Sequence, residues 1–262
     1  MRASIGKSLE GRDIDAFSNF PIQSGAPHSR FTLLIGGTHG DERATVPILE
    51  DFLSRVLPDL DAFAAVIPLL NPDGHRRDGR YNARGVDLNR NFPHRWSALG
   101  EEPPGKAPLS EPESESLHRF ILAMRPEKIV SLHWALGEID ADGPQSAGLA
   151  GAMWDALSDG ANPPYRLRLP GNGDATGFCP GSLGQWCGYG LTYPGGGRPA
   201  MVTLELPHHA GGGPCPGSLP EDHLESVASL WKNDPRSYLA GVEGPVHRAL
   251  AAACRFASGP GG

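Results

Sequence analysis

The chain is poor in cysteine. Its 262 residues include four cysteines, Cys179, Cys187, Cys215 and Cys254, and no two of them have CxxC spacing. The absence of CxxC pairs argues against a zinc site built from paired cysteines, and the low cysteine content argues against the disulfide framework of a small secreted domain. Free thiols are the simplest interpretation, although Cys179 and Cys187 flank the segment GSLGQW and could approach each other.

The chain also lacks a long apolar run. The longest, from Ala62 to Leu70, contains Pro68 and is far shorter than the ~20 residues that a transmembrane helix needs. The first residues, MRASIGKSLEGRD, have no apolar segment of the kind found in signal peptides. We therefore expect a cytoplasmic protein with no membrane partner.

An excess of positive charge is missing as well. The formal net charge is −7, which argues against binding to nucleic acid or to an anionic membrane surface. The length is sufficient for one large α/β domain with its own core. The pattern does not indicate an oligomeric state.

Short apolar runs alternate with helical patterns along the chain. The predicted strands are residues 31–36, 63–70, 128–134 and 201–206, and the predicted helices are residues 42–57, 110–124, 149–157, 221–231 and 238–256. Ser110 and Glu113 have the spacing of a capping box at the start of the second helix. Segments 94–110, 160–180 and 208–220 are rich in glycine and proline and are predicted loops.

This alternation predicts a mostly parallel sheet with helices on both faces. In such sheets, ligands bind beyond the carboxyl ends of the strands. Four polar residues, His39, Asn71, His133 and Glu205, follow or end predicted strands. We therefore expect them to share one edge of the sheet.

Two of these residues, together with Glu42, form a candidate metal site. His39 and Glu42 stand three residues apart in GGTHGDE, and His133 ends a strand in SLHW. Catalytic zinc usually takes three such protein ligands and keeps one open position. Each fragment alone also fits a helix-capping pair or a hydrogen-bonded core histidine. Together they predict one zinc ion per chain, bound by His39, Glu42 and His133.

The motifs resemble those of the zinc carboxypeptidase superfamily, and within it those of the murein peptide amidases. The matching segments are SIGKSLEGRDI, IGGTHGDE, NPDG, GVDLNRNFP, SLHW, PGSLGQWC and TLELP, from residue 4 to about residue 207. The resemblance implies a three-layer α/β/α fold around a twisted, mixed, mostly parallel eight-stranded sheet. We expect residues 1–256 to form this single catalytic domain and residues 257–262 to be a disordered tail.

The resemblance also implies catalytic roles. Glu205 in TLELP matches the family's general base, and a carboxylate that ends a core strand needs a partner or a function. Arg80 matches the arginine that stabilises the oxyanion, a charge suited to a guanidinium. Its neighbour Arg84 remains an alternative. Asp87 matches the carboxylate that orients the first histidine ligand, here His39.

Asn89 and Arg90 in DLNRNF match the family's pair for binding a carboxylate. Such a pair selects a small peptide substrate that ends in a free α-carboxylate. In the segment TGFCPGS, Phe178 stands where digestive carboxypeptidases carry a mobile tyrosine. The nearby loop is therefore the expected wall of the specificity pocket, and Asp174 and Gln185 are candidate contacts.

The preferred hypothesis is hydrolysis of the amide between γ-D-glutamate and a terminal meso-diaminopimelate in recycled murein peptides. Two other enzymatic readings are a carboxypeptidase for ordinary peptides and an aspartoacylase-like deacylase of N-acyl amino acids. A non-catalytic zinc-binding protein is a fourth reading. The presence of Arg80 and Glu205 argues against it, because a degenerate site usually loses its base.

Overall fold

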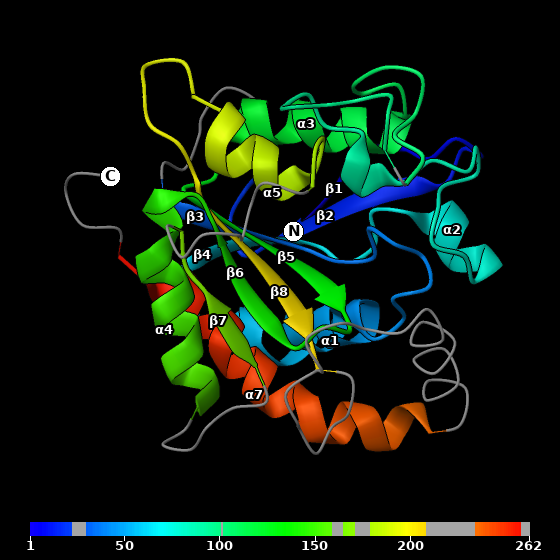
Figure 1. The fold of residues 1–262 in the computed structure, drawn as a ribbon. Coiled ribbons are helices and arrows are strands. Elements are labelled where there is room, and N and C mark those ends of the chain that lie inside the picture. Colours follow the sequence, from blue (N-terminus) through cyan, green and yellow to red (C-terminus); the bar gives the residue numbers. More distant parts are fainter. Residues whose placement is uncertain (23–29, 101, 159–164, 171–178, 208–233, 258–262) are drawn as a thin grey trace.

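One eight-stranded sheet runs through the protein in the computed structural model (Figure 1). The structure describes residues 1–22, 30–100, 102–158, 165–170, 179–207 and 234–257. The predicted helix 221–231, the predicted loop 208–220, Asp174, Phe178, Cys215 and most of the expected tail lie outside these residues.

The strands have the order β1-β2-β4-β3-β5-β8-β6-β7 across the sheet. Their bounds are β1 Arg2–Lys7, β2 Asp13–Ser18, β3 Phe31–Ile35, β4 Phe63–Ile67, β5 Lys128–Trp134, β6 Glu138–Asp142, β7 Arg166–Arg168 and β8 Ala200–Leu206. The central strands β4, β3, β5 and β8 run parallel to one another. The pairs β1–β2, β2–β4 and β6–β8 are antiparallel, so the sheet is mixed and mostly parallel.

Helices cover both faces of the sheet (Figure 1). On one face lie α1 Thr45–Asp51, α4 Ala147–Ser158 and α7 Pro235–Arg255, which pack on alternate strand residues such as Leu34, Val130 and Leu204. On the other lie α3 Pro112–Met124, α5 Leu183–Gln185 and the short π-helix η5 Trp186–Gly190, which pack against residues such as Leu33 and Ile129. This arrangement confirms the predicted α/β/α layers.

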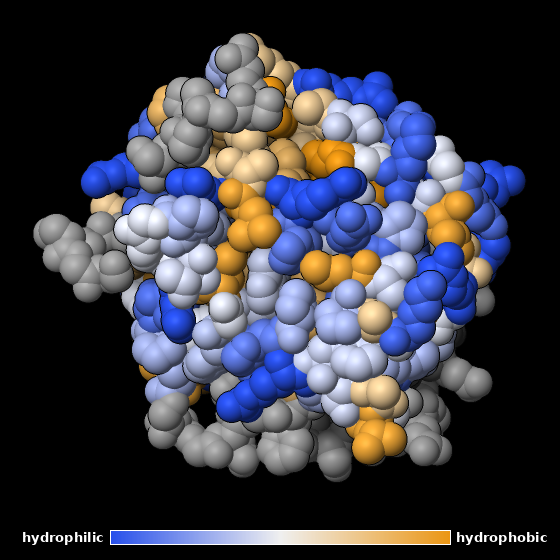
Figure 2. All heavy atoms as spheres, turned by 90° about the horizontal axis from the view of Figure 1, so that it is seen from above, coloured by the Kyte–Doolittle hydropathy of each residue, from blue (hydrophilic) through white to orange (hydrophobic). Residues whose placement is uncertain are grey.

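Further short helical elements occur between the longer helices in the sequence. They are the π-turn η1 Phe52–Val56, the 3₁₀ turns η2 Leu57–Asp59, η3 Leu88–Arg90 and η4 Pro144–Ser146, and the short helix α2 Pro72–Arg77. Among the described residues, no helix is long and apolar enough to cross a membrane. On the face shown in Figure 2, hydrophilic side chains are interspersed with smaller apolar groups, as is usual for a protein surface.

Several local expectations need correction. The helix predicted from residue 42 begins at Thr45, because the chain first makes a turn in which the Thr45 hydroxyl donates to the carbonyl of Glu42. The capping box at Ser110 is absent: Glu111 stands at the N-cap position without a capping hydrogen bond from its side chain, and Ser110 donates to the Glu111 carboxylate instead. Strand β7 lies within the predicted loop 160–180.

The cysteines show no disulfide in the described part of the chain. Cys179 is exposed, whereas Cys187 and Cys254 are buried, and all three are free thiols. The possible pairing of Cys179 with Cys187 is therefore wrong for this structure.

Candidate metal centre

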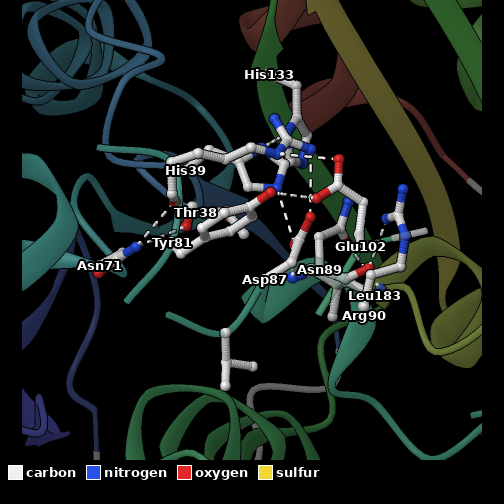
Figure 3. A network of polar contacts seen from close by, with 12 residues as sticks. Thr38, His39, Asn71, Tyr81, Asp87, Asn89, Arg90, Glu102, His133 and Leu183 are labelled. Atoms are coloured by element: carbon white, nitrogen blue, oxygen red, sulfur yellow. Dashed lines mark hydrogen bonds and ion pairs between the residues drawn. The ribbon is translucent and has the colours of Figure 1, made fainter. Parts of the chain in front are cut away.

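Three side chains that could bind one metal ion meet at the carboxyl ends of β3 and β5, and Figure 3 shows two of them, His39 and His133. His39 and Glu42 lie between β3 and α1, and His133 lies near the end of β5. Nδ1 of His39 is 2.6 Å from Oε1 of Glu42, and Nδ1 of His133 is 3.0 Å from Oε2 of Glu42. All three residues are buried. The structure thus brings together the three predicted ligands.

The outward nitrogens of both histidines have partners. Nε2 of His39 is 3.1 Å from Oδ1 of Asp87, and Nε2 of His133 is 3.1 Å from the hydroxyl of Ser131. Partners of this kind fix the ring orientation and the tautomer of a metal-binding histidine. Both Nδ1 atoms therefore point toward the Glu42 carboxylate, and one metal ion could be bound by all three side chains.

The electrostatics of the group favour a cation. Burial opposes a charged His39, but the carboxylates of Glu42 and Asp87 outweigh it and raise the pKa of His39 to about 9. Burial likewise opposes a charged Glu42, yet His39 and His133 hold the pKa of that carboxyl well below its usual range. The carboxylates of Glu42 and Asp87 beside the two imidazoles give the group the negative charge that suits a metal cation. Two imidazoles and one carboxylate form a donor set that fits zinc.

Glu205 lies on β8 directly beside His133 on β5, in the register of the parallel pair. Its Oε2 atom is buried and has no hydrogen-bond partner among the described residues. Burial raises the pKa of Glu205 to about 7, and the nearby His133 only partly opposes this rise. A carboxyl group with such a pKa can both accept and release a proton near neutral pH.

Arg80 reaches the same group from the loop after α2. Its guanidinium lies 3.5 Å from Glu42 and 3.3 Å from Asp87. Burial opposes its charge, but Asp87 and Glu42 outweigh this effect and raise the pKa of Arg80 above its usual value. The alternative, Arg84, is half exposed and pairs with the buried Glu111 at 2.9 Å. The structure therefore places Arg80, and not Arg84, beside the metal ligands.

Asn89 and Arg90 lie in the 3₁₀ turn η3 next to Asp87. The Asn89 backbone N–H donates to Asp87, and Oδ1 of Asn89 accepts from the N–H of Leu183 at the start of α5. The Arg90 guanidinium donates to the carbonyl of Asn89. These contacts connect the predicted carboxylate-binding pair to the histidine ligand through Asp87. Gln185, at the end of α5, is buried.

The sequence analysis missed several neighbours of the site. Ser131 could have been found, because it stands two residues before His133 on one face of a strand. Tyr81 donates to Glu102 at 2.6 Å, and Glu102 lies 3.9 Å from the Arg80 guanidinium. No motif marks Glu102, since it comes from the glycine- and proline-rich loop after η3.

Comparisons with known proteins agree with this geometry. The model of the zinc carboxypeptidase family matches residues 2–135. Murein peptide amidase A of Vibrio campbellii is 32% identical over 248 residues, which cover 88% of each chain. Murein peptide amidase A of Escherichia coli K12 is 35% identical over 171 residues, or 59% of this chain and 65% of that relative, slightly under two thirds of its length.

Solved structures show the same fold. The murein-tripeptide amidase from Escherichia coli O157 is 29% identical, with a TM-score of 0.58, over 87% of this chain and 90% of its own. Carboxypeptidase A from Helicoverpa armigera is 19% identical, with a TM-score of 0.64, over 97% of this chain and 69% of its own. The second similarity concerns the fold alone.

The family match covers most of the site. Residues 2–135 include His39, Glu42, Arg80 and His133 but end well before Glu205. The register of β5 and β8 is therefore what connects Glu205 to the matched residues.

Proposed function

Because the chain belongs to the zinc carboxypeptidase family, we propose that it hydrolyses the amide between γ-D-glutamate and a terminal meso-diaminopimelate in murein peptides. It is a zinc-dependent hydrolase of the metallopeptidase type. The substrate assignment rests chiefly on the similarity to murein peptide amidase A of Vibrio campbellii, which extends over 88% of both chains.

His39, Glu42 and His133 would bind the zinc ion through Nδ1, a carboxylate oxygen and Nδ1. Their mutual contacts and the outward partners Asp87 and Ser131 support this assignment. Zinc bound there would supply Lewis-acid polarisation of the scissile carbonyl. The chain's own residues would provide the proton transfers and the binding of substrate charges.

Glu205 would act as the general base. Its buried Oε2 atom would take a proton from the attacking water and later deliver it to the leaving amine. The absence of a hydrogen-bond partner for Oε2 among the described residues supports the role. The pKa of about 7 also supports it, because the carboxylate form is then substantially populated at neutral pH.

Arg80 would stabilise the negative charge that develops on the carbonyl oxygen. Its guanidinium keeps its proton, since Asp87 and Glu42 raise its pKa further. It also lies 3.5 Å from Glu42, a proposed metal ligand, which supports a position close to the scissile carbonyl. Preorganised charge of this type is commonly a large contribution to catalysis.

Asn89 and Arg90 would bind the free α-carboxylate of the released residue. Asn89 is oriented by Leu183 and connected to the site by Asp87. Asp174 and Gln185 are proposed contacts for the distant amino and carboxylate groups of meso-diaminopimelate. This part of the proposal predicts cleavage at a free C-terminus only.

The cellular setting remains a proposal as well. We infer a role in the recycling of peptidoglycan peptides, in the cytoplasm, by residues 1–256 acting as one catalytic domain. The similarity to murein peptide amidases supports the substrate class. The proposed location can be tested by fractionating cells that express the tagged full chain.

A substrate panel tests the proposed activity. It contains L-Ala-γ-D-Glu-meso-diaminopimelate, its lysine analogue, an ordinary dipeptide and N-acetylaspartate, each assayed with zinc-saturated protein. We expect the first to have a kcat/KM about tenfold above the others, equivalent to about 1.4 kcal/mol of transition-state binding. Faster cleavage of the ordinary dipeptide would favour a general carboxypeptidase, and faster cleavage of N-acetylaspartate would favour a deacylase.

A further inference from the structure

Asn71 occupies a fully buried position between the metal-binding loop and the loop that carries Arg80. It follows β4 and caps α2, with its Oδ1 atom accepting from the N–H of Gly74 at 2.9 Å. A side-chain acceptor at this position satisfies one of the free N–H groups of the helix. This contact alone would require only an acceptor, and aspartate would serve equally well.

The other half of the Asn71 amide makes two contacts that aspartate could not make. Its Nδ2 atom lies 3.3 Å from the carbonyl of Thr38 and 3.4 Å from the carbonyl of Arg80 (Figure 3). Thr38 directly precedes the ligand His39. One buried donor group therefore joins the backbone beside a metal ligand to the backbone of the proposed oxyanion residue.

A second contact supports the same connection. The N–H of Gly40 donates to the carbonyl of Arg80 at 3.2 Å, so this carbonyl is bound by both Asn71 and the metal-binding loop. A Cβ atom on Gly40 would lie 2.1 Å from the carbonyl carbon of Gly74 and 2.3 Å from the nitrogen of His75. Only glycine permits this approach. The backbone around His39 and the Arg80 loop are thus packed directly against each other.

We propose that Asn71 is a positioning residue that fixes the Arg80 guanidinium relative to the metal ligands. This inference rests on the proposed function of Arg80. The backbone of Arg80 is fixed by Asn71 and Gly40, and its side chain then extends to Glu42 and Asp87. Movement of the backbone anchor would move the guanidinium away from the developing oxyanion.

The substitution Asn71→Asp separates this role from helix capping. Aspartate keeps the Oδ1 acceptor for Gly74, and a negative charge at a helix N-terminus is favourable. It replaces the Nδ2 donor with a second acceptor, which faces the two carbonyls of Thr38 and Arg80. The variant should therefore keep α2 and lose the connection between the two loops.

Displacement of a catalytic group by about 1 Å can lower the rate roughly 10²-fold. We expect Asn71→Asp to lower kcat by about 10- to 100-fold, with KM changed by less than about threefold and one zinc retained per chain. Asn19→Asp is the matched control, because Asn19 also joins two backbone groups, at Ala62 and Ala64, but is itself exposed, directly after β2. It should leave kcat unchanged.

A double-mutant cycle in the zinc-loaded full chain tests whether Asn71 acts through Arg80. Wild type, Asn71→Asp, Arg80→Ala and the double variant are assayed on the substrate of the panel that wild type cleaves fastest. If the inference is correct, Asn71→Asp has little further effect on kcat once Arg80 is absent. Asn71→Ser, which keeps a shorter acceptor without a charge, replaces Asn71→Asp if the latter does not fold.

Four results would overturn the inference. Independent, multiplicative effects of the two substitutions would show that Asn71 does not act through Arg80. Loss of zinc from Asn71→Asp would assign Asn71 to the support of the metal-binding loop instead. A normal kcat for Asn71→Asp, together with a lowered kcat for Arg80→Ala, would refute the positioning role and leave the proposed function intact. A normal kcat for Arg80→Ala would refute both.

Discussion

His133 and Glu205 are paired residues on the adjacent parallel strands β5 and β8. Side chains at paired positions of neighbouring strands project from the same face, and the strands lie about 5 Å apart. The register therefore places a proposed metal ligand beside the proposed base, although the two residues are 72 positions apart in the sequence. A shift of β8 by one residue would turn Glu205 to the opposite, apolar face.

The zinc assignment predicts one metal ion per chain. His133→Ala should remove the metal, because only two of three ligands remain, while the far-UV circular dichroism stays unchanged. His118→Ala is a suitable control, since His118 lies on α3 against Trp186 and is not a member of the metal-binding group. Elemental analysis of the purified proteins provides the measurement. Two metal ions per wild-type chain, or full zinc in the His133 variant, would contradict the assignment.

Replacement of the proposed base should separate binding from turnover. Glu205→Gln keeps the side-chain shape but cannot accept the proton, so kcat should fall by roughly 10²- to 10⁴-fold. Zinc content and KM should change little. Glu115→Gln, an exposed substitution on α3, controls for the loss of one charge. Steady-state kinetics with zinc analysis tests this, and a near-normal kcat would exclude Glu205 from the mechanism.

Much of this site follows from the sequence because motifs and strand ends coincide. The proposed ligands and Glu205 follow or end apolar runs that predict buried strands, and ligands of a parallel sheet bind at the carboxyl ends of its strands. The four predicted strands are the central ones of the sheet, and they were recognisable because both of their faces are buried and apolar. Strand β6 was missed because Glu138, Asp140 and Asp142 interrupt its apolar pattern. Likewise β1 and β7 are edge strands with few buried residues, so they lack a strong signal.

Contacts made by loops could not be read in the same way. Glu102 comes near Arg80 only through the path of a long connection, and no periodic pattern encodes that path. The contacts of Arg80 and Arg84 depend on the folded chain in the same way. The buried Glu111 pairs with Arg84, whereas Arg80 lies beside Glu42 and Asp87, which favours Arg80 for the proposed role.

That difference between the two arginines is testable. Arg80→Ala should lower kcat with only a modest change in KM, as expected for an interaction that strengthens in the transition state. Arg84→Ala should leave kcat near the wild-type value but lower the free energy of unfolding, because Glu111 would remain buried without its cation. Kinetics and urea denaturation measure the two effects. The reverse pattern would transfer the catalytic role to Arg84.

The last prediction concerns the pH dependence of stability. Asp142 is buried on β6, and burial, with a smaller contribution from Asp140, raises its pKa to about 8. Its Oδ2 atom accepts from the hydroxyl of Thr203 at 2.7 Å. Between the unfolded pKa of about 4 and the folded value, the folded state binds more protons than the unfolded state. The contribution of Asp142 to the free energy of unfolding should therefore decrease as pH rises through this window.

Asp142→Asn removes this titration while retaining an acceptor for Thr203. The stability of the variant relative to wild type should rise steadily from pH 5 to pH 8, as measured by urea denaturation of zinc-saturated protein. The comparison at each pH cancels the titration of the metal ligands, which both proteins share. Asp155→Asn is an exposed substitution on α4, and its free energy of unfolding should differ from that of wild type by the same amount at every pH. A constant difference between Asp142→Asn and wild type across the range would mean that the Asp142 carboxyl ionises normally in the folded protein.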